Sequence, residues 1–406
     1  MKIIMADYLY IDGDYHREYA VAFGEKIEAV GPRREILARY PDAERMEQLP
    51  HSVLYPGLIN THVHLEFSAN KTTLKYGDYL PWLYSVIEER NHLSDLCTSE
   101  MMLQECRAML ESGVTAFGAI SSMGLDLEAC VKTPQRVVYF NELIGQDSEK
   151  LDALYDAFME RFESSSRYAE ENVTPAVAIH SPYSVHPTIR RKAVTFAREN
   201  GLILSAHFLE SEAERQWLDH SRGPFREFFE SFFGRSQPVT SIEAFLSEFD
   251  GCPTHFTHCV QAGESELIKI AEEKHTIAHC PRSNRYLGCG RLAIEELNAL
   301  DIPFTVATDG LSSNDSLNLF EELRAALMMH GDLEIGRLAG ELMASVTINA
   351  AEVLGLDCGL IEEGRKADFA LIQLPETPRR EADIALWTIL HTERVSQLYI
   401  GGDRII

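Results

Sequence analysis

The distribution of hydrophobic and polar positions divides the chain into a long central part and two shorter ends. Residues 1–55 have the pattern of short strands, with turns at Asp12-Gly13 and Gly31-Pro32. From about residue 57, short apolar runs alternate with longer amphipathic stretches. After about residue 360, strand-and-turn composition returns in GLIEEGRKADFALIQL and VSQLYIGGDRII. We therefore expect one small β-sandwich domain built from both chain ends, with the boundaries 1–56, 57–358 and 359–406.

Eight apolar runs in the central part predict eight strands. They span residues 57–64, 114–121, 136–143, 174–181, 202–209, 253–260, 275–281 and 302–310. Stretches with helical periodicity separate most of them, for example Ser99–Ser112, Ser148–Ala169, Thr188–Asn200 and Ser265–Lys274. Eight successive strand and helix alternations favour an α/β fold in which parallel strands close into a (β/α)8 TIM barrel.

Charge and cysteine usage narrow the class of protein. The 406 residues include 37 Lys and Arg against 63 Asp and Glu, so the net charge is −26, which argues against a nucleic-acid partner. No segment approaches the roughly 20 apolar residues that span a bilayer, and the N-terminus lacks the apolar core of a signal peptide. The eight cysteines form no CxxC pair, which is typical of reduced thiols. We expect a cytoplasmic protein that has no membrane contact.

Polar side chains close several of the predicted strands. His62 and His64 are two residues apart, so they point to the same side of the first strand. Later strands end at His180, His207, His258 and Asp309. The carboxyl ends of barrel strands meet at one face, where active sites lie. Three imidazoles and a carboxylate suit a metal such as zinc, with a water molecule completing the shell.

Two further positions bear on the chemistry. His255 lies three residues before His258, so the two should point to opposite faces, and we select His258 because it is nearer the strand end. Glu210 follows His207 by three residues and should lie beside the metal, where a carboxylate can shuttle protons. The alternative for Glu210 is an exposed loop carboxylate that caps the next helix.

Four motifs in this order carry a family resemblance: PGLINTHVHLE, HFLES, HCPRSN and TDGLSSNDSLNLFEELR. Together they resemble the amidohydrolase superfamily, specifically its chlorohydrolase/deaminase branch, over nearly the whole chain. Within that branch, HLEFSANKTTLKYGDYLPWLYSVI, HSPYSV and HFLES are similar to the aminodeoxyfutalosine deaminases of menaquinone biosynthesis.

The resemblance implies a set of metal ligands and catalytic groups. It implies one divalent metal ion bound by His62, His64, His207 and Asp309. The strand that ends at His180 contains no lysine, which fits a single metal. Zinc is the expected ion, and Fe²⁺ and Mn²⁺ are alternatives. Glu210, His258 and Asp309 are the implied catalytic residues. Asp309 would accept a proton from the attacking water, Glu210 would protonate a ring nitrogen, and His258 would donate to or orient the attacking oxygen.

The implied reaction is hydrolytic deamination of 6-amino-6-deoxyfutalosine to futalosine and ammonia. This substrate carries an aromatic carboxylate and a ribose besides its adenine. Arg282 and Arg285 are candidates for the carboxylate, with bracing of the barrel rim as the alternative. Glu66 is a candidate for the ribose or the ring, and His180 for the purine.

Other functions remain open at this point. The same catalytic set would serve deamination of adenosine, methylthioadenosine, S-adenosylhomocysteine or guanine, and a triazine substrate is less favoured. A non-catalytic barrel scaffold is the least favoured, because scaffold descendants usually lose metal ligands. Relatives often form homodimers, and the sequence leaves the oligomeric state open.

Overall fold

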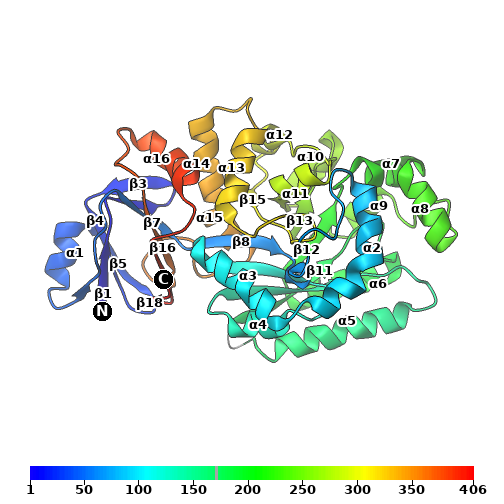
Figure 1. The fold of residues 1–406 in the computed structure, drawn as a ribbon, viewed down its shortest axis with the longest axis horizontal. Coiled ribbons are helices and arrows are strands. Elements are labelled where there is room, and N and C mark those ends of the chain that lie inside the picture. The colour runs from blue at the N-terminus through cyan, green and yellow to red at the C-terminus, as the bar shows by residue number, and fades with distance from the viewer. Residues whose placement is uncertain (170–171) are drawn as a thin grey trace.

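Eight parallel strands in chain order form a nearly closed barrel (Figure 1). The computed structural model describes residues 1–169 and 172–406. The barrel strands are β8 (Leu58–Val63), β9 (Val114–Ser121), β10 (Arg136–Leu143), β11 (Val173–Ile179), β12 (Leu204–Phe208), β13 (Thr254–His258), β14 (Thr276–His279) and β15 (Phe304–Val306). Between the two outermost strands, the Asp309 amide donates to the His62 carbonyl at 3.1 Å. The predicted α/β barrel is therefore confirmed.

Helices after the strands cover the outside of the barrel (Figure 1). They are α2 (Tyr79–Leu96), α3 (Ser99–Glu111), α4 (Leu127–Lys132), α5 (Leu151–Ser166), α6 (Pro187–Asn200), α7 (Glu212–His220), α8 (Pro224–Phe233), α9 (Ile242–Ser247), α10 (Glu264–Glu272), α11 (Pro281–Tyr286), α12 (Ile294–Ala299), α13 (Leu319–Met329), α14 (Ile335–Ser345) and α15 (Ile348–Val353). Several predicted strands are shorter than expected. The strand predicted at residues 275–281 ends at His279, because Pro281 begins a helix, where its fixed φ and missing N–H cost nothing.

The chain ends form two small sheets. One contains β1 (Lys2–Met5), β4 (Tyr19–Phe23), β5 (Ile27–Pro32) and β6 (Glu44–Arg45). The other contains β2 (Tyr8–Ile11), β3 (Asp14–Arg17), β7 (Ser52–Pro56), β16 (Phe369–Gln373), β17 (Gln397–Ile400) and β18 (Asp403–Arg404). Because β16 pairs antiparallel with β7, the two ends share one sheet. The boundaries at residues 56 and 358 stay predictions.

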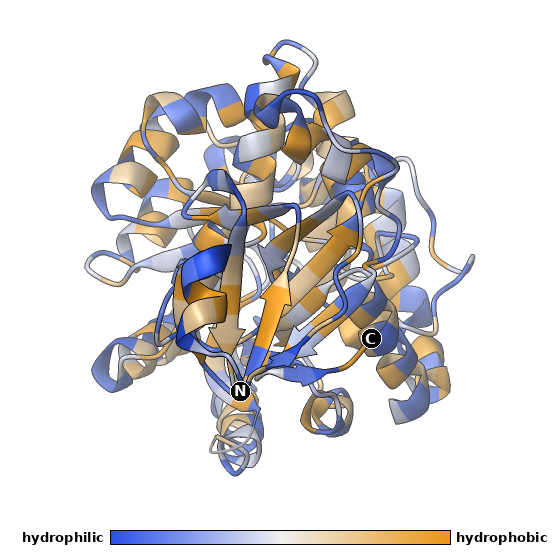
Figure 2. Ribbon diagram, turned by 90° about the vertical axis from the view of Figure 1, so that its left-hand side faces the viewer, coloured by the Kyte–Doolittle hydropathy of each residue, from blue (hydrophilic) through white to orange (hydrophobic). Residues whose placement is uncertain are grey.

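Apolar side chains from both sheets pack together. Ile4 and Val21 of the first sheet join Leu54 and Phe369 of the second in one buried cluster, as in a β-sandwich. Figure 2 shows hydrophobic residues along the middle of these strands. Helix α1 (Arg33–Arg39) packs on β4 and β5, and α16 (Ile384–His391) packs on α14. Within the described residues, no helix combines the length and apolar character needed to cross a membrane.

A buried ion pair joins the barrel to the terminal strands. Asp368, just before β16, accepts from Arg136 Nε at 2.8 Å and from Arg136 Nη2 at 3.1 Å. The Gly401 amide also donates to Asp368 Oδ1 at 2.7 Å. The Asp368 side chain is fully buried, whereas Arg136 is a quarter exposed. This carboxylate therefore links three segments that are far apart in sequence.

We predict that Asp368→Ala lowers the free energy of unfolding by about 3 kcal/mol, because it leaves a largely buried guanidinium unpaired. Chemical denaturation would measure the change. The matched control is Glu25→Ala, which breaks an exposed ion pair with Lys366 and should have no measurable effect. Equal stability of the two variants would contradict this account.

Candidate active site

Three histidines converge at the carboxyl end of the barrel. His64 Nε2 lies 3.2 Å from His62 Nε2 and 3.4 Å from His207 Nε2. His62 and His64 come from one strand end, and their shared direction follows from the two-residue spacing. All three nitrogen ligand atoms lie within 4.8 Å of one another. The sequence-predicted cluster is therefore assembled in space.

The cluster has the donor chemistry of a metal site. His207 Nδ1 lies 2.8 Å from the His180 carbonyl, which can only accept, so the Nε2 of a neutral His207 carries a lone pair. Burial lowers the pKa of His62 and of His207 well below the ordinary value, which favours neutral rings. A cation between these ring nitrogens could accept a lone pair from each of them. The residues therefore fit a divalent ion such as zinc.

Asp309 completes the cluster from the segment after β15, which lies beside β8. Its Oδ1 lies 3.5 Å from His64 Nε2, and its Oδ2 accepts from the hydroxyls of Ser283 and Ser313 at 2.8 Å each. Asp309 adopts a left-handed backbone with φ of 58°, a strained conformation that is frequent at functional sites. A Cβ on Gly310 would lie 2.6 Å from His64 Cβ, so the close approach of this loop requires glycine.

Glu210 and His258 lie next to the histidine cluster. Glu210 Oε1 is 3.6 Å from His258 Nε2, and the His258 ring stacks at 5.6 Å on the ring of His207. His258 Nδ1 lies 2.8 Å from Asn284 Oδ1, which orients the ring. Burial raises the pKa of the Glu210 carboxyl above its usual value. A raised pKa favours the protonated form, and a protonated carboxyl group can act as a proton donor.

Two tyrosines that the sequence analysis missed support Glu210. The Tyr79 hydroxyl donates to Glu210 Oε2 at 3.0 Å and lies 2.8 Å from the Tyr183 hydroxyl. Tyr183 stands in the HSPYSV motif, three residues after His180, so its place in the sequence was the available signal. Tyr79 begins α2 and stands in the HLEFSANKTTLKYGDYLPWLYSVI motif, but its contact with Glu210 becomes visible only in the fold.

The alternative role for Glu210 was to cap the next helix, α7, but other residues cap that helix. Ser211 is the N-cap of α7 and accepts from the Glu214 amide at 3.2 Å. Glu214 in turn accepts from the amides of Leu209 at 3.2 Å and of Glu210 at 2.9 Å. The Glu210 side chain is therefore left free to face His258.

The predicted substrate contacts lie in different environments. The His180 ring is 5.0 Å from the His207 ring and therefore borders the cluster. Glu66 is buried and accepts from three backbone amides of the loop after β9, which occupies both of its oxygens. Arg285 is exposed at the end of α11. The substrate-binding roles of these residues stay predictions.

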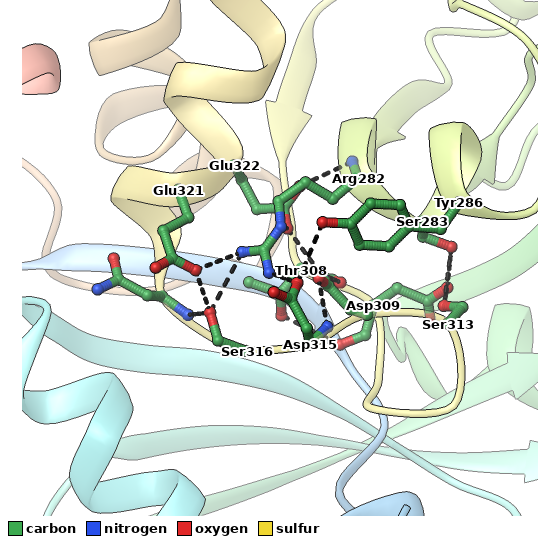
Figure 3. Close-up of polar contacts among 12 residues, drawn as sticks. Arg282, Ser283, Tyr286, Thr308, Asp309, Ser313, Asp315, Ser316, Glu321 and Glu322 are labelled. Carbon is green, nitrogen blue, oxygen red and sulfur yellow. Dashed lines mark hydrogen bonds and ion pairs between the residues drawn. The ribbon is translucent and has the colours of Figure 1, made fainter. Parts of the chain in front are cut away.

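Arg282 lies in a dense network of acidic side chains (Figure 3). Its guanidinium donates to Glu321 at 2.7 Å and to Ser316 at 3.2 Å, and it also pairs with Asp315. Glu322 lies 3.5 Å from Arg282 Nε. These contacts tie the loop after β15 to α13. Because three carboxylates surround the guanidinium, these contacts fit the alternative in which Arg282 braces the barrel rim, and its substrate-binding role stays a prediction.

Comparisons with known proteins agree with this geometry. The amidohydrolase family profile matches residues 53–405. The chain is 45% identical over 387 residues to an aminodeoxyfutalosine deaminase of Nitratiruptor, covering 95% of each chain. It is 32% identical to an adenosine deaminase of Helicobacter pylori, covering 96% of this chain and 95% of the relative. The crystal structure of Helicobacter pylori aminofutalosine deaminase with methylthio-coformycin superposes with a TM-score of 0.94 at 31% identity, covering all of both chains.

We predict that His207→Ala binds less than about one-tenth of the metal held by the parent protein, because it removes one of three converging imidazoles. Elemental analysis of the purified variants would measure the content. The matched control is Glu210→Gln, which should retain full metal content and lose turnover. Normal metal content in His207→Ala would contradict the assigned site.

Proposed function

The chain belongs to the amidohydrolase family, and from this premise we propose that it is a metal-dependent deaminase that converts 6-amino-6-deoxyfutalosine to futalosine and ammonia. The observation that best supports this proposal is the 45% identity to an aminodeoxyfutalosine deaminase over nearly the full length of both chains. The site supports the reaction, because the metal-type cluster is flanked by two carboxyl groups with different surroundings, Asp309 and Glu210. The second candidate is deamination of another purine nucleoside, which the similarity to an adenosine deaminase favours.

The ligands of the metal would be His62, His64, His207 and Asp309. Zn²⁺ is the ion we propose for this nitrogen and oxygen set, with Fe²⁺ and Mn²⁺ as alternatives. When bound, such an ion supplies a Lewis acid that makes water a competent nucleophile near neutral pH. The buried imidazoles would keep this water apart from bulk solvent.

Asp309 would act as the base. The hydroxyls of Ser283 and Ser313 fix its Oδ2, so Oδ1 is the atom that faces the cluster. A carboxylate held in this position can accept a proton from the attacking water and later deliver one to the departing amino group.

Glu210 would act as the acid. Its raised pKa keeps a proton available for the ring nitrogen beside the reacting carbon. Protonation of that nitrogen makes the carbon more electrophilic. His258 would orient the attacking oxygen, since its Nε2 faces both Glu210 and the cluster. His180 would border the purine.

We also propose a cytoplasmic location. All eight cysteines are buried and free, which suits a compartment that keeps thiols reduced. The expected homodimer stays a prediction.

A substrate panel tests the proposed function. Metal-loaded protein would be assayed with aminodeoxyfutalosine, adenosine, methylthioadenosine, S-adenosylhomocysteine and guanine, following the ultraviolet change on loss of the amino group. We expect kcat/KM to be about 100-fold or more higher for aminodeoxyfutalosine than for any other compound. Equal or better turnover of adenosine would favour the second candidate. No turnover of any purine would contradict both.

We predict that Tyr79→Phe shifts the basic limb of the kcat/KM pH profile to higher pH. The Tyr79 hydroxyl lowers the pKa of Glu210, so its removal raises that pKa and the protonated acid persists to higher pH. Metal content should not change. An unchanged basic limb, or a shift to lower pH, would show that Tyr79 does not act through Glu210.

A further inference from the structure

One buried carboxyl group beside the histidine cluster has no part in the chemistry described so far. Glu142 lies near the carboxyl end of β10, and its side chain is fully buried. Its Oε1 lies 3.6 Å from His207 Nδ1 and has no hydrogen-bond partner among residues 1–169 and 172–406. We propose that Glu142 is a positioning residue that orients the His207 ring toward the metal and balances part of the metal's charge. The inference rests on the metal site of the proposed function, and it holds for any purine substrate.

Two groups from neighbouring strands face the Nδ1 edge of His207. The His180 carbonyl, directly after β11, lies 2.8 Å from Nδ1 and accepts its hydrogen. The Glu142 carboxyl, from β10, is also within ion-pair distance of this atom. Both groups favour the tautomer with the hydrogen on Nδ1, so the lone pair is on the Nε2 atom that faces His64. A carboxylate on this edge also makes Nε2 a stronger donor to a metal ion.

The other oxygen of Glu142 is fixed by the loop after β9. The Ser122 hydroxyl donates to Glu142 Oε2, and the Ser122 amide donates to Glu66 Oε2 at 2.9 Å. Glu66 follows His64 by two residues, so the network begins beside a proposed ligand. The Glu142 carbonyl accepts from Arg161 Nη2 at 2.8 Å, which fixes the backbone as well. Oε1 is therefore the one atom of this carboxyl group that remains to face the cluster.

The charge of the site gives a second reason for a carboxylate at this place. Asp309 is the only anion among the proposed ligands, so a divalent ion leaves one positive charge uncompensated in a buried site. Burial raises the pKa of the Glu142 carboxyl, so a negative charge at this depth requires a positive partner. In the described part of the chain, His207 is the one side chain within ion-pair distance of Glu142. The cation and this carboxylate would therefore stabilise each other through the His207 ring.

Zinc affinity tests the proposal without turnover. Competition with a chromophoric chelator would measure the Kd of Zn²⁺ for the parent and for Glu142→Gln. This variant keeps the size of the side chain and removes its charge. We expect it to raise the Kd by about 10- to 100-fold, as is typical when the partner of a ligating histidine is lost. A Kd equal to that of the parent would overturn the proposal.

Asp126→Asn is the matched control. Asp126 is fully buried, its Oδ1 accepts from Ser121 and Tyr139, and its Oδ2 has no hydrogen-bond partner within residues 1–169 and 172–406. Unlike Glu142, it forms no ion pair with a histidine of the described chain. We expect the zinc Kd of this variant to stay within about threefold of the parent value, because the charge is lost away from the ligands. A loss as large as that in Glu142→Gln would overturn the proposal.

Cobalt substitution separates a positioning role from a merely structural one. Co²⁺ bound in place of zinc absorbs visible light, and its absorption bands report the donors around the ion. We expect these bands to shift in Glu142→Gln and to stay unchanged in Asp126→Asn, because only the first variant alters the donor strength of His207. A lower melting temperature of metal-free Glu142→Gln, with unchanged bands and zinc affinity, would show a structural role alone and overturn the proposal.

The same measurements separate this inference from the proposed function. If the parent binds zinc and deaminates a purine, equal zinc affinity of the parent and Glu142→Gln overturns the inference alone. If the parent binds no zinc, the metal site and the inference both fail. A higher KM of zinc-saturated Glu142→Gln with unchanged zinc affinity would identify a substrate contact and overturn the role toward His207. Weaker zinc binding by Glu142→Gln supports the inference whichever purine the parent prefers.

Discussion

The convergence of three imidazole nitrogens inside the barrel is the constraint on which the rest of the site depends. Burial disfavours the charged form of His62 and His207, so these rings meet as neutral lone-pair donors at 3.2 and 3.4 Å from His64. Such an arrangement suits a cation, which can accept a lone pair from each ring. The surrounding structure holds these rings close together and brings Asp309 against them from another strand.

The supporting contacts explain why the loop after β15 is so heavily bonded. Asp309 is strained at φ of 58°, and two serines fix one of its oxygens. Arg282 and its acidic partners then anchor the following segment to α13 (Figure 3). Strain at a functional residue persists only where its neighbours over-determine the conformation. After β12, Glu214 fixes the backbone of Glu210 by accepting from the amides of Leu209 and Glu210. The Glu210 side chain therefore stays available for chemistry.

Periodicity made the barrel and the histidine cluster predictable. The strand runs were apolar enough to locate each strand, and the two-residue spacing of His62 and His64 fixed their common direction. Contacts between distant segments could not be read in this way. The carboxylates that pair with Arg282 lie 33 to 40 residues further along the chain. The sequence therefore could not show that this guanidinium is bound by acidic side chains of the same chain. The same holds for Tyr79, which lies 131 residues before its acceptor Glu210.

The most direct test of the central claim is a metal titration of metal-free protein that follows deaminase activity and thermal unfolding together. The account predicts that activity on aminodeoxyfutalosine is absent at the start, rises in proportion to added Zn²⁺ and stops rising at one equivalent per chain. The melting temperature should rise over the same range, because an ion bound by the folded state alone stabilises it. Full activity without metal, or saturation only at two equivalents, would contradict a single catalytic ion at the histidine cluster.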